Sequence, residues 1–162
     1  MYLNDVCGRS FVSTWRVDSQ SRTLKLTLLQ CEYAVTWGDG TVDRVLNTDG
    51  KFTQLDNPDA NLLHTYARAG DYDVKIVGDI SACPFFPSPS NGQLVDVKRW
   101  GWVSLHSPKG QQFKDCKVLI QFSAANVPLA AIANIQEMFS GCTQFKDDLS
   151  VSFVLCPMLS YQ

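Results

Sequence analysis

The segment Trp37-Gly38-Asp39-Gly40-Thr41 places two glycines around one aspartate, directly after an apolar run that ends in tryptophan. Glycine readily adopts the positive backbone φ that tight turns require, and an aspartate side chain can accept hydrogen bonds from backbone amides two residues on. The segment therefore predicts a tight turn between two strands, with the indole of Trp37 contributing buried area.

The residues on both sides of this turn read as short strands. Leu24, Leu26 and Leu28 recur with period two, which is the pattern of a half-buried strand. We expect strands over residues 11–17, 22–29, 33–37, 41–46, 63–66 and 71–77, with a polar loop over 47–61. Short strands at intervals of roughly 8–12 residues are typical of a β-sandwich.

Two later stretches complete a pattern with the turn. They are His64-Thr65-Tyr66 and Gly70-Asp71-Tyr72-Asp73-Val74. The series resembles the polycystic-kidney-disease (PKD) repeat, an immunoglobulin-like sandwich whose members carry a WGDGT turn and a later HTY and G-x-Y-x-V stretch. The resemblance covers residues 11–80 and implies an architectural role for the motif residues Trp37, Gly38, Asp39, Gly40, His64, Tyr66 and Tyr72.

A change of composition separates this half of the chain from the next. Residues 81–92, SACPFFPSPSNG, hold three prolines, which break regular structure. Phe85 and Phe86 favour an ordered elbow over a free tether. We therefore expect a sandwich over 1–82, an elbow over 83–93 and a second module over 94–162.

The second half of the chain repeats a short motif. Phe113-x-x-Cys116-x-x-Leu119 recurs 26 residues later as Phe139-x-x-Cys142-x-x-Phe145, and a degenerate copy begins another 14 residues on at Phe153. A period of 20–29 residues is typical of leucine-rich solenoids, in which equivalent side chains stack from one coil to the next. Cys116 and Cys142 should therefore face the interior. Short helices are expected over 107–115 and 131–140.

The repeats carry a second resemblance. Residues 134–150 fit the unit N-x-x-x-M-F-x-x-C-x-x-F-x-x-D-L-S of BspA-like leucine-rich repeat surface proteins, residue by residue. In large surface proteins such repeats recur together with WGDGT sandwiches. The fold class we expect is mainly β with short helices: an immunoglobulin-like (PKD-type) β-sandwich followed by a short leucine-rich-repeat-like solenoid.

Composition and charge exclude several function classes. Fourteen Lys and Arg against sixteen Asp and Glu give a net charge of -2 without a basic cluster, so nucleic-acid binding is not expected. The longest apolar stretch, 127–135, is too short for membrane insertion. Six cysteines without a CxxC pair and two histidines match no zinc-site spacing, so we expect buried free thiols and no cofactor.

Catalysis and calcium binding each have one candidate cluster. His64 near Asp39 could serve as a general base, but a strand histidine that packs beside Trp37 is the favoured interpretation. Asp39, Asp43 and Asp49 could surround a calcium ion, but their spacing matches no calcium loop and favours solvated turn residues. No nucleophile elbow or phosphate loop is present in the sequence, and we expect no enzyme.

The function we expect is that of a non-enzymatic structural or interaction protein. A repeat array needs covered ends, and the apolar side chains near the end of this sequence are a candidate docking surface: Phe153, Val154, Leu155, Met158, Leu159 and Tyr161. The beginning, MYLNDVCGRS, has no secretory signal pattern. We therefore expect a virion surface component, a phage capsid decoration or tail-associated protein that docks on virion subunits, including copies of itself.

An alternative function stays open. The protein could be an adhesin-like module on a bacterial cell surface that binds a glycan or a host protein. Phe85, Trp100 and Trp102 would then form an exposed platform for stacking a ligand. The competing interpretation of this aromatic cluster is interface core between the two modules.

Overall fold

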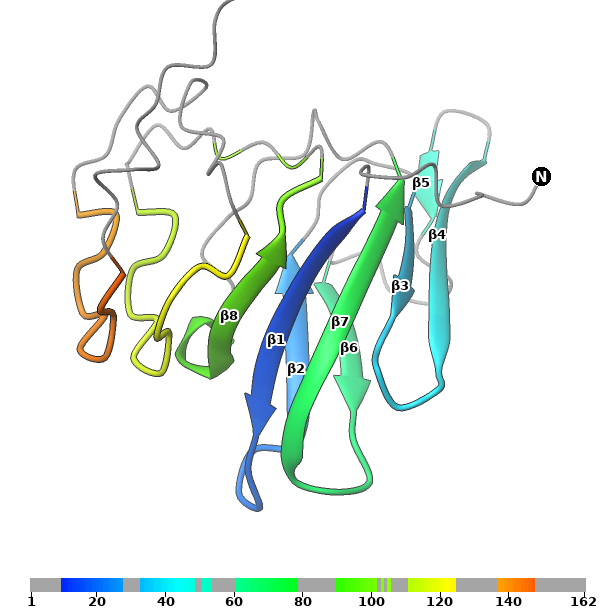
Figure 1. Cartoon of the computed structure of the whole chain (residues 1–162). Helices are drawn as coiled ribbons and strands as arrows, with labels where there is room; N and C mark the ends of the chain where they lie inside the picture. Colours follow the sequence, from blue (N-terminus) through cyan, green and yellow to red (C-terminus); the bar gives the residue numbers. More distant parts are fainter. Residues whose placement is uncertain are drawn as a thin grey trace, which may run out of the picture.

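The computed structural model of the chain describes residues 10–27, 33–48, 51–53, 61–78, 90–101, 103, 105, 111–124 and 137–147. Within these ranges the protein is mainly β, with antiparallel sheets and one three-residue 3-10 helix. The elements in order are β1 (Phe11–Val17), β2 (Thr23–Thr27), β3 (Tyr33–Thr36), β4 (Val42–Thr48), β5 (Lys51–Thr53), β6 (Asn61–Thr65), β7 (Gly70–Gly78), η1 (Asn91–Gln93) and β8 (Leu94–Arg99) (Figure 1).

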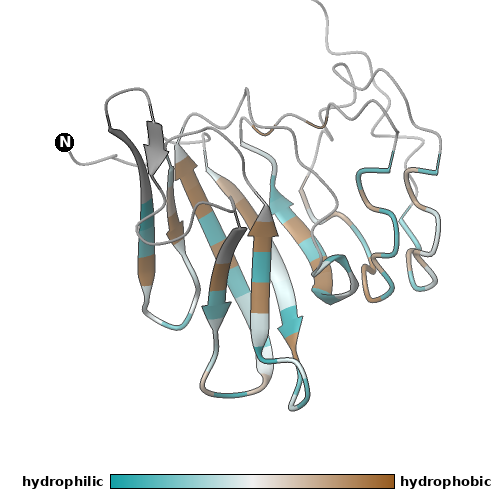
Figure 2. Ribbon diagram, turned by 180° about the vertical axis from the view of Figure 1, so that it is seen from behind, coloured by the Kyte–Doolittle hydropathy of each residue, from teal (hydrophilic) through white to brown (hydrophobic). Residues whose placement is uncertain are grey.

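The strands form two sheets. The larger has six strands in the order β5-β4-β3-β7-β1-β8, and the smaller pairs β2 with β6. The pair β2–β6 lies behind β1 and β7 in Figure 1 and in front of them in the reversed view of Figure 2, so it covers one face of the larger sheet. This arrangement of antiparallel sheets is compatible with a β-sandwich.

Alternating side chains fill the space between the sheets. Along β1, Phe11 and Trp15 are 1% exposed, and Phe11 pairs with the buried Ile76 of β7. From the smaller sheet, Leu24 and Leu26 are buried against them. The alternation is visible in Figure 2 as hydrophobic and hydrophilic bands along the strands. Removing one such large side chain from water stabilises the fold by about 1.5–3 kcal/mol.

The predicted strands are present, with shifted ends. The strand predicted over 11–17 matches β1, whereas β3, β4, β6 and β7 begin or end one or two residues from the predicted bounds. The predicted strand over 22–29 corresponds to β2, and its last two positions lie outside the described residues. The polar loop predicted over 47–61 is wrong in part, because β5 pairs with β4 inside it.

The strand β8 was not expected to belong to the sandwich. It comes from the segment assigned to the second module, yet it pairs antiparallel with β1, with Ser13 opposite Val97 and Thr14 opposite Asp96. Leu94 and Val97 are 0% exposed, since they share the buried core of β1. The second part of the chain therefore starts as an edge strand of the larger sheet.

The expected short helices are wrong where the structure describes them. Residues 111–115 and 137–140 form successive turns. Their backbone bonds join residues three apart, as in Cys116 N to Phe113 O at 3.1 Å and Cys142 N to Phe139 O at 3.1 Å. Asp115 and Glu137 have φ of 61° and 57°, a left-handed conformation that ends an α-helix.

Candidate functional site

The WGDGT turn has the geometry that its residues predict. Gly38 and Gly40 have φ of 85° and 96°, and the Thr41 amide donates a hydrogen bond of 3.0 Å to Asp39 Oδ1. A Cβ at Gly38 would lie 2.7 Å from the backbone oxygen of Asp73 in β7. The turn therefore needs glycine at this position for conformation and for space.

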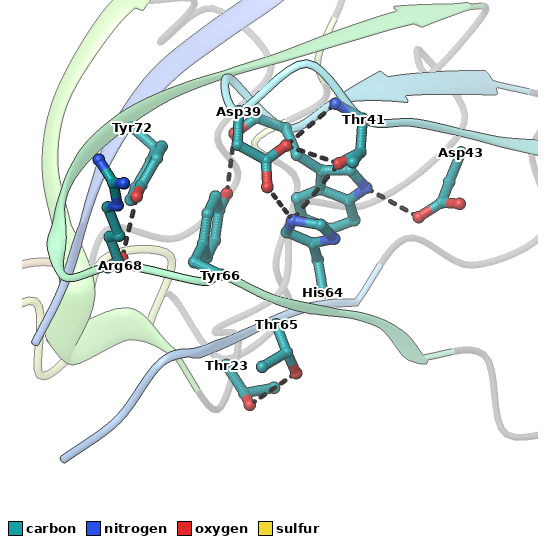
Figure 3. Close-up of polar contacts among 10 residues, drawn as sticks. Thr23, Asp39, Thr41, Asp43, His64, Thr65, Tyr66, Arg68 and Tyr72 are labelled. Atoms are coloured by element: carbon teal, nitrogen blue, oxygen red, sulfur yellow. Dashed lines mark hydrogen bonds and ion pairs between the residues drawn. The ribbon is translucent and has the colours of Figure 1, made fainter. Parts of the chain in front are cut away.

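Trp37 is the centre of a network of rings and hydrogen bonds, and its partners Asp43, His64 and Tyr66 are labelled in Figure 3. Its indole Nε1 donates to Asp43 Oδ2 at 2.8 Å, and its carbonyl accepts a 2.9 Å bond from the Tyr66 hydroxyl. The His64 ring stacks on the indole with centroids 4.7 Å apart, and Tyr72 stacks on Tyr66 at 4.0 Å. The Asp43 carboxylate is thus the hydrogen-bond acceptor of the Trp37 indole N–H.

Asp39 and His64 form the polar edge of this network. His64 Nε2 lies 2.7 Å from Asp39 Oδ2, and the Thr41 hydroxyl donates a 2.6 Å bond to Asp39 Oδ1. Burial acts to raise the pKa of Asp39, but the hydrogen bonds from Thr41 and His64 outweigh it and hold that pKa at about 2. Asp39 Oδ1 is thus bonded within the turn and Oδ2 to His64 of β6, and the packing of His64 beside Trp37 is confirmed.

Trp100 is buried at the junction between the sheets and the repeat turns. It is 5% exposed, and its ring lies 6.3 Å from Phe11, 6.1 Å from Phe113 and 5.0 Å from Phe122 between centroids. The interpretation of Trp100 as an exposed stacking platform is wrong, because the ring is enclosed by core residues; the interface-core interpretation is confirmed for it. Phe85 and Trp102 lie outside the described residues.

The copies of the repeat motif that start at Phe113 and Phe139 form stacked turns, here called the first repeat turn (113–116) and the second repeat turn (139–142). The amide of Phe113 donates to Met138 O at 3.1 Å, and that of Asp115 donates to Ser140 O at 2.8 Å. The rings of Phe113 and Phe139 are stacked at 5.7 Å with 10° between their planes. Equivalent residues 26 positions apart therefore face each other, as the spacing predicts.

The segments that follow each turn are also joined in series. The amide of Ile120 donates to Val95 O of β8 at 3.1 Å, and that of Lys146 donates to Ile120 O at 3.0 Å. In Figure 1 the turn segments lie beside β8 one after the other, the yellow one next to it and the orange one beyond. The backbone hydrogen bonding of the larger sheet thus continues from β8 through the segments that follow the two repeat turns.

Burial falls from the first repeat turn to the second. Phe113, Cys116 and Leu119 are 0% exposed, whereas their equivalents Phe139, Cys142 and Phe145 are only half-buried. Within the described part of the chain, nothing accepts a hydrogen bond from the amides of Phe139 and Gly141, although the equivalent amides in the first turn are bonded. We call these three side chains and two amides the terminal face.

The sequence did not single out the terminal face as a surface. The predicted docking residues lie outside the described residues: Phe153, Val154, Leu155, Met158, Leu159 and Tyr161. The sequence feature that could have predicted the terminal face is the 26-residue offset between the two copies of the motif. After the copy that starts at Phe139, the degenerate copy follows at a spacing of only 14 residues.

Comparison with models of known protein families, with curated proteins and with solved structures finds no match to this chain. In the ranges that the structure describes, no three His, Cys, Asp or Glu side chains come together as a group able to hold a metal ion. Nor does any helix among the described residues have the length and apolar character needed to cross a membrane.

Proposed function

We propose that the protein is a non-enzymatic structural component that docks on neighbouring protein subunits through the terminal face. The observation that supports this proposal is the contrast in burial between equivalent residues. Phe113 is fully buried, and Phe139 of the second repeat turn stacks on its ring, whereas Phe139 itself is only half-buried.

The terminal face offers both of the contributions that a polypeptide partner uses. Full burial of a large apolar side chain is favourable by roughly 1.5–3 kcal/mol. A partner that completes the burial of a half-buried ring gains part of this free energy. The amides of Phe139 and Gly141 are equivalent to those of Phe113 and Asp115, which donate to carbonyls at the second repeat turn. A strand or turn of a partner could supply carbonyls to them in the same way. This combination fits a protein segment better than a sugar ring.

Together with this function we propose a more specific assignment of the fold. We assign the first part to a PKD-type immunoglobulin-like sandwich, supported by the network of Trp37, His64 and Tyr66 around the WGDGT turn. We assign the second part to a short BspA-like leucine-rich repeat array, supported by the 26-residue register of the stacked turns.

A virion surface is the setting that we propose for this docking. The neighbouring subunits would be capsid or tail proteins, including further copies of the chain. The apolar side chains between Phe153 and Tyr161 are proposed as a second part of the contact.

The experiment compares two charge insertions in the full chain. Phe145→Glu places a carboxylate on the terminal face, and Ile120→Glu places one on the 39% exposed Ile120 of the preceding segment. We expect wild type and Ile120→Glu to co-sediment with particles from infected cells and Phe145→Glu to lose most of this binding. Circular dichroism and thermal unfolding of each variant check that the fold is kept.

Wild-type protein supplies the decisive control. If it stays a monomer in sedimentation velocity at all concentrations and never co-sediments with particles, the proposal is wrong, whatever the variants do. Equal loss of particle binding in both folded variants would also contradict docking through the terminal face.

A further inference from the structure

The stacked turns bring two free thiols together. Cys116 is fully buried in the first repeat turn, and Cys142 is half-buried in the second. The bonds from Phe113 N to Met138 O and from Asp115 N to Ser140 O set a register in which these cysteines are opposite each other. The Cys142 thiol donates to Phe113 O at 2.9 Å, so its sulfur lies directly over the first turn.

The spacing of the two backbones suits a disulfide. Segments joined by such hydrogen bonds run about 4.8 Å apart. A disulfide joins residues whose Cα atoms are roughly 4.4–6.8 Å apart. Opposite cysteines in neighbouring turns fall in this window, so the bond can form with side-chain rotation and small shifts of the turns.

We propose that Cys116 and Cys142 are an oxidisable dithiol, in which the Cys142 thiolate attacks a hydroperoxide and Cys116 then closes the disulfide. This inference goes beyond the proposed function and does not rest on it. It rests on the register of the turns, the contact of the two thiols and the difference in their exposure.

The two thiols are suited to different steps. When Cys142 ionises, its sulfur accepts hydrogen bonds from the thiol and the amide of Cys116, and the thiol bond above all lowers the pKa of Cys142. That same contact, together with burial, raises the pKa of Cys116. The nearby Asp115 carboxylate disfavours ionisation of both. Cys142, the more accessible of the two thiols, is thus the nucleophile, and Cys116 keeps its proton until the second step.

The reaction balances in two steps. The Cys142 thiolate attacks one oxygen of hydrogen peroxide, the O–O bond breaks, and sulfenic acid and hydroxide form. The Cys116 sulfur then attacks the Cys142 sulfur, the S–O bond breaks, and the leaving hydroxyl takes the Cys116 proton to become water. Two thiols lose two electrons, and the peroxide is reduced to two molecules of water once the hydroxide takes the Cys142 proton.

The test uses the reduced full chain, hydrogen peroxide and mass spectrometry. Trypsin cuts after Lys114, Lys117 and Lys146, so the two cysteines fall in separate peptides, 115–117 and 118–146. We expect these peptides to be joined after peroxide treatment and separated again by a reductant. The joined form should be absent in C116A and in C142A.

Two further measurements separate a reactive pair from thiols that are merely packed. In C116A, a dimedone adduct should accumulate at Cys142, because no second thiol consumes the sulfenic acid. Alkylation of Cys142 by iodoacetamide at neutral pH should slow several-fold in C116A and recover in C116S, whose hydroxyl restores the donor.

Three results would overturn the proposal. One is that both thiols stay reduced at peroxide concentrations that oxidise free glutathione. Another is that Cys142 proceeds to sulfinic acid in wild type without a link to Cys116. The third is an alkylation rate of Cys142 that is the same in wild type, C116A and C116S.

Discussion

Gly38 lies where a side chain has neither conformational freedom nor space. Its φ is 85°, and an added Cβ would meet Asp73 O at 2.7 Å. A left-handed conformation costs an alanine about 1–2 kcal/mol, and the clash with backbone adds to this cost. We expect Gly38→Ala to lower the free energy of unfolding by more than that conformational cost, measured by urea denaturation.

Gly40 is the matched control for this substitution. Its φ is 96°, but nothing lies within 4 Å of the added Cβ. Gly40→Ala should therefore lose only the conformational contribution. Equal losses for the two alanines would mean that β7 moves away from Gly38 at no cost and that the close contact has no energetic weight.

Asp39 makes the stability of the sandwich depend on pH. Its pKa is held at about 2 in the folded protein, below the value of about 3.9 of an unfolded chain. A carboxyl group whose pKa is lowered by folding stabilises the fold above the unfolded pKa, and this contribution is lost as the pH falls toward the folded pKa. We expect the free energy of unfolding to decrease between pH 4 and pH 2.

Asp39→Asn is the control for the pH experiment. The amide oxygen still accepts from Thr41, but the side chain no longer titrates. Urea denaturation across the same pH range should give a shallower slope for this variant than for wild type. Parallel curves would assign the acid sensitivity to the other ion pairs, which are Arg16 with Asp71, Lys98 with Asp73 and Lys114 with Glu137.

The conformations of single turn residues could be predicted from the sequence, because they depend on interactions with neighbours in the chain. Positive φ at two glycines and an aspartate that folds back on Thr41 depend only on neighbours in the chain. The acceptor for the Trp37 indole could not be assigned, since Asp43 reaches it only once β3 and β4 are paired. The burial of Trp100 required the folded positions of Phe11, Phe113 and Phe122.

The repeat turns can be compared through one substitution at equivalent positions. Phe113 is 0% exposed, whereas Phe139 is half-buried. Truncating a fully buried phenylalanine to alanine costs roughly 3–5 kcal/mol, and the cost falls with exposure. We expect Phe113→Ala to lower the free energy of unfolding by about twice as much as Phe139→Ala, measured by urea denaturation. Equal costs would show that the terminal face is already fully covered.

Strands were predicted well where apolar and polar residues alternate, and the segments that form turns were predicted poorly. The alternation of residues 11–17 gave β1 with its bounds. The helices expected over 107–115 and 131–140 are turns in their described parts, where the positive φ of Asp115 and Glu137 is incompatible with an α-helix. Nothing in residues 94–99 says which strand they pair with, so the partnership of β8 with β1 was not predictable.

At the scale of the whole molecule, the described core is continuous from the two sheets to the repeat turns. One cluster of buried side chains runs from Trp37 through Phe11 and Trp100 to Phe113. The backbone follows the same path, because β1 pairs with β8 and β8 bonds to Ile120. Neither half can then unfold without exposing apolar surface of the other.

This continuity predicts cooperative unfolding, which hydrogen exchange can measure at two distant amides. Val35 in the centre of the larger sheet reports on the sandwich, and Ile120, bonded to Val95, reports on the repeats. Phe113→Ala, a change in the repeats, should lower the protection of both amides by the same factor, and Gly38→Ala, a change in the sandwich, should do so too. If Phe113→Ala released Ile120 while Val35 kept its wild-type protection, the halves would be independent, and the packing of Trp100 between them would contribute little to stability.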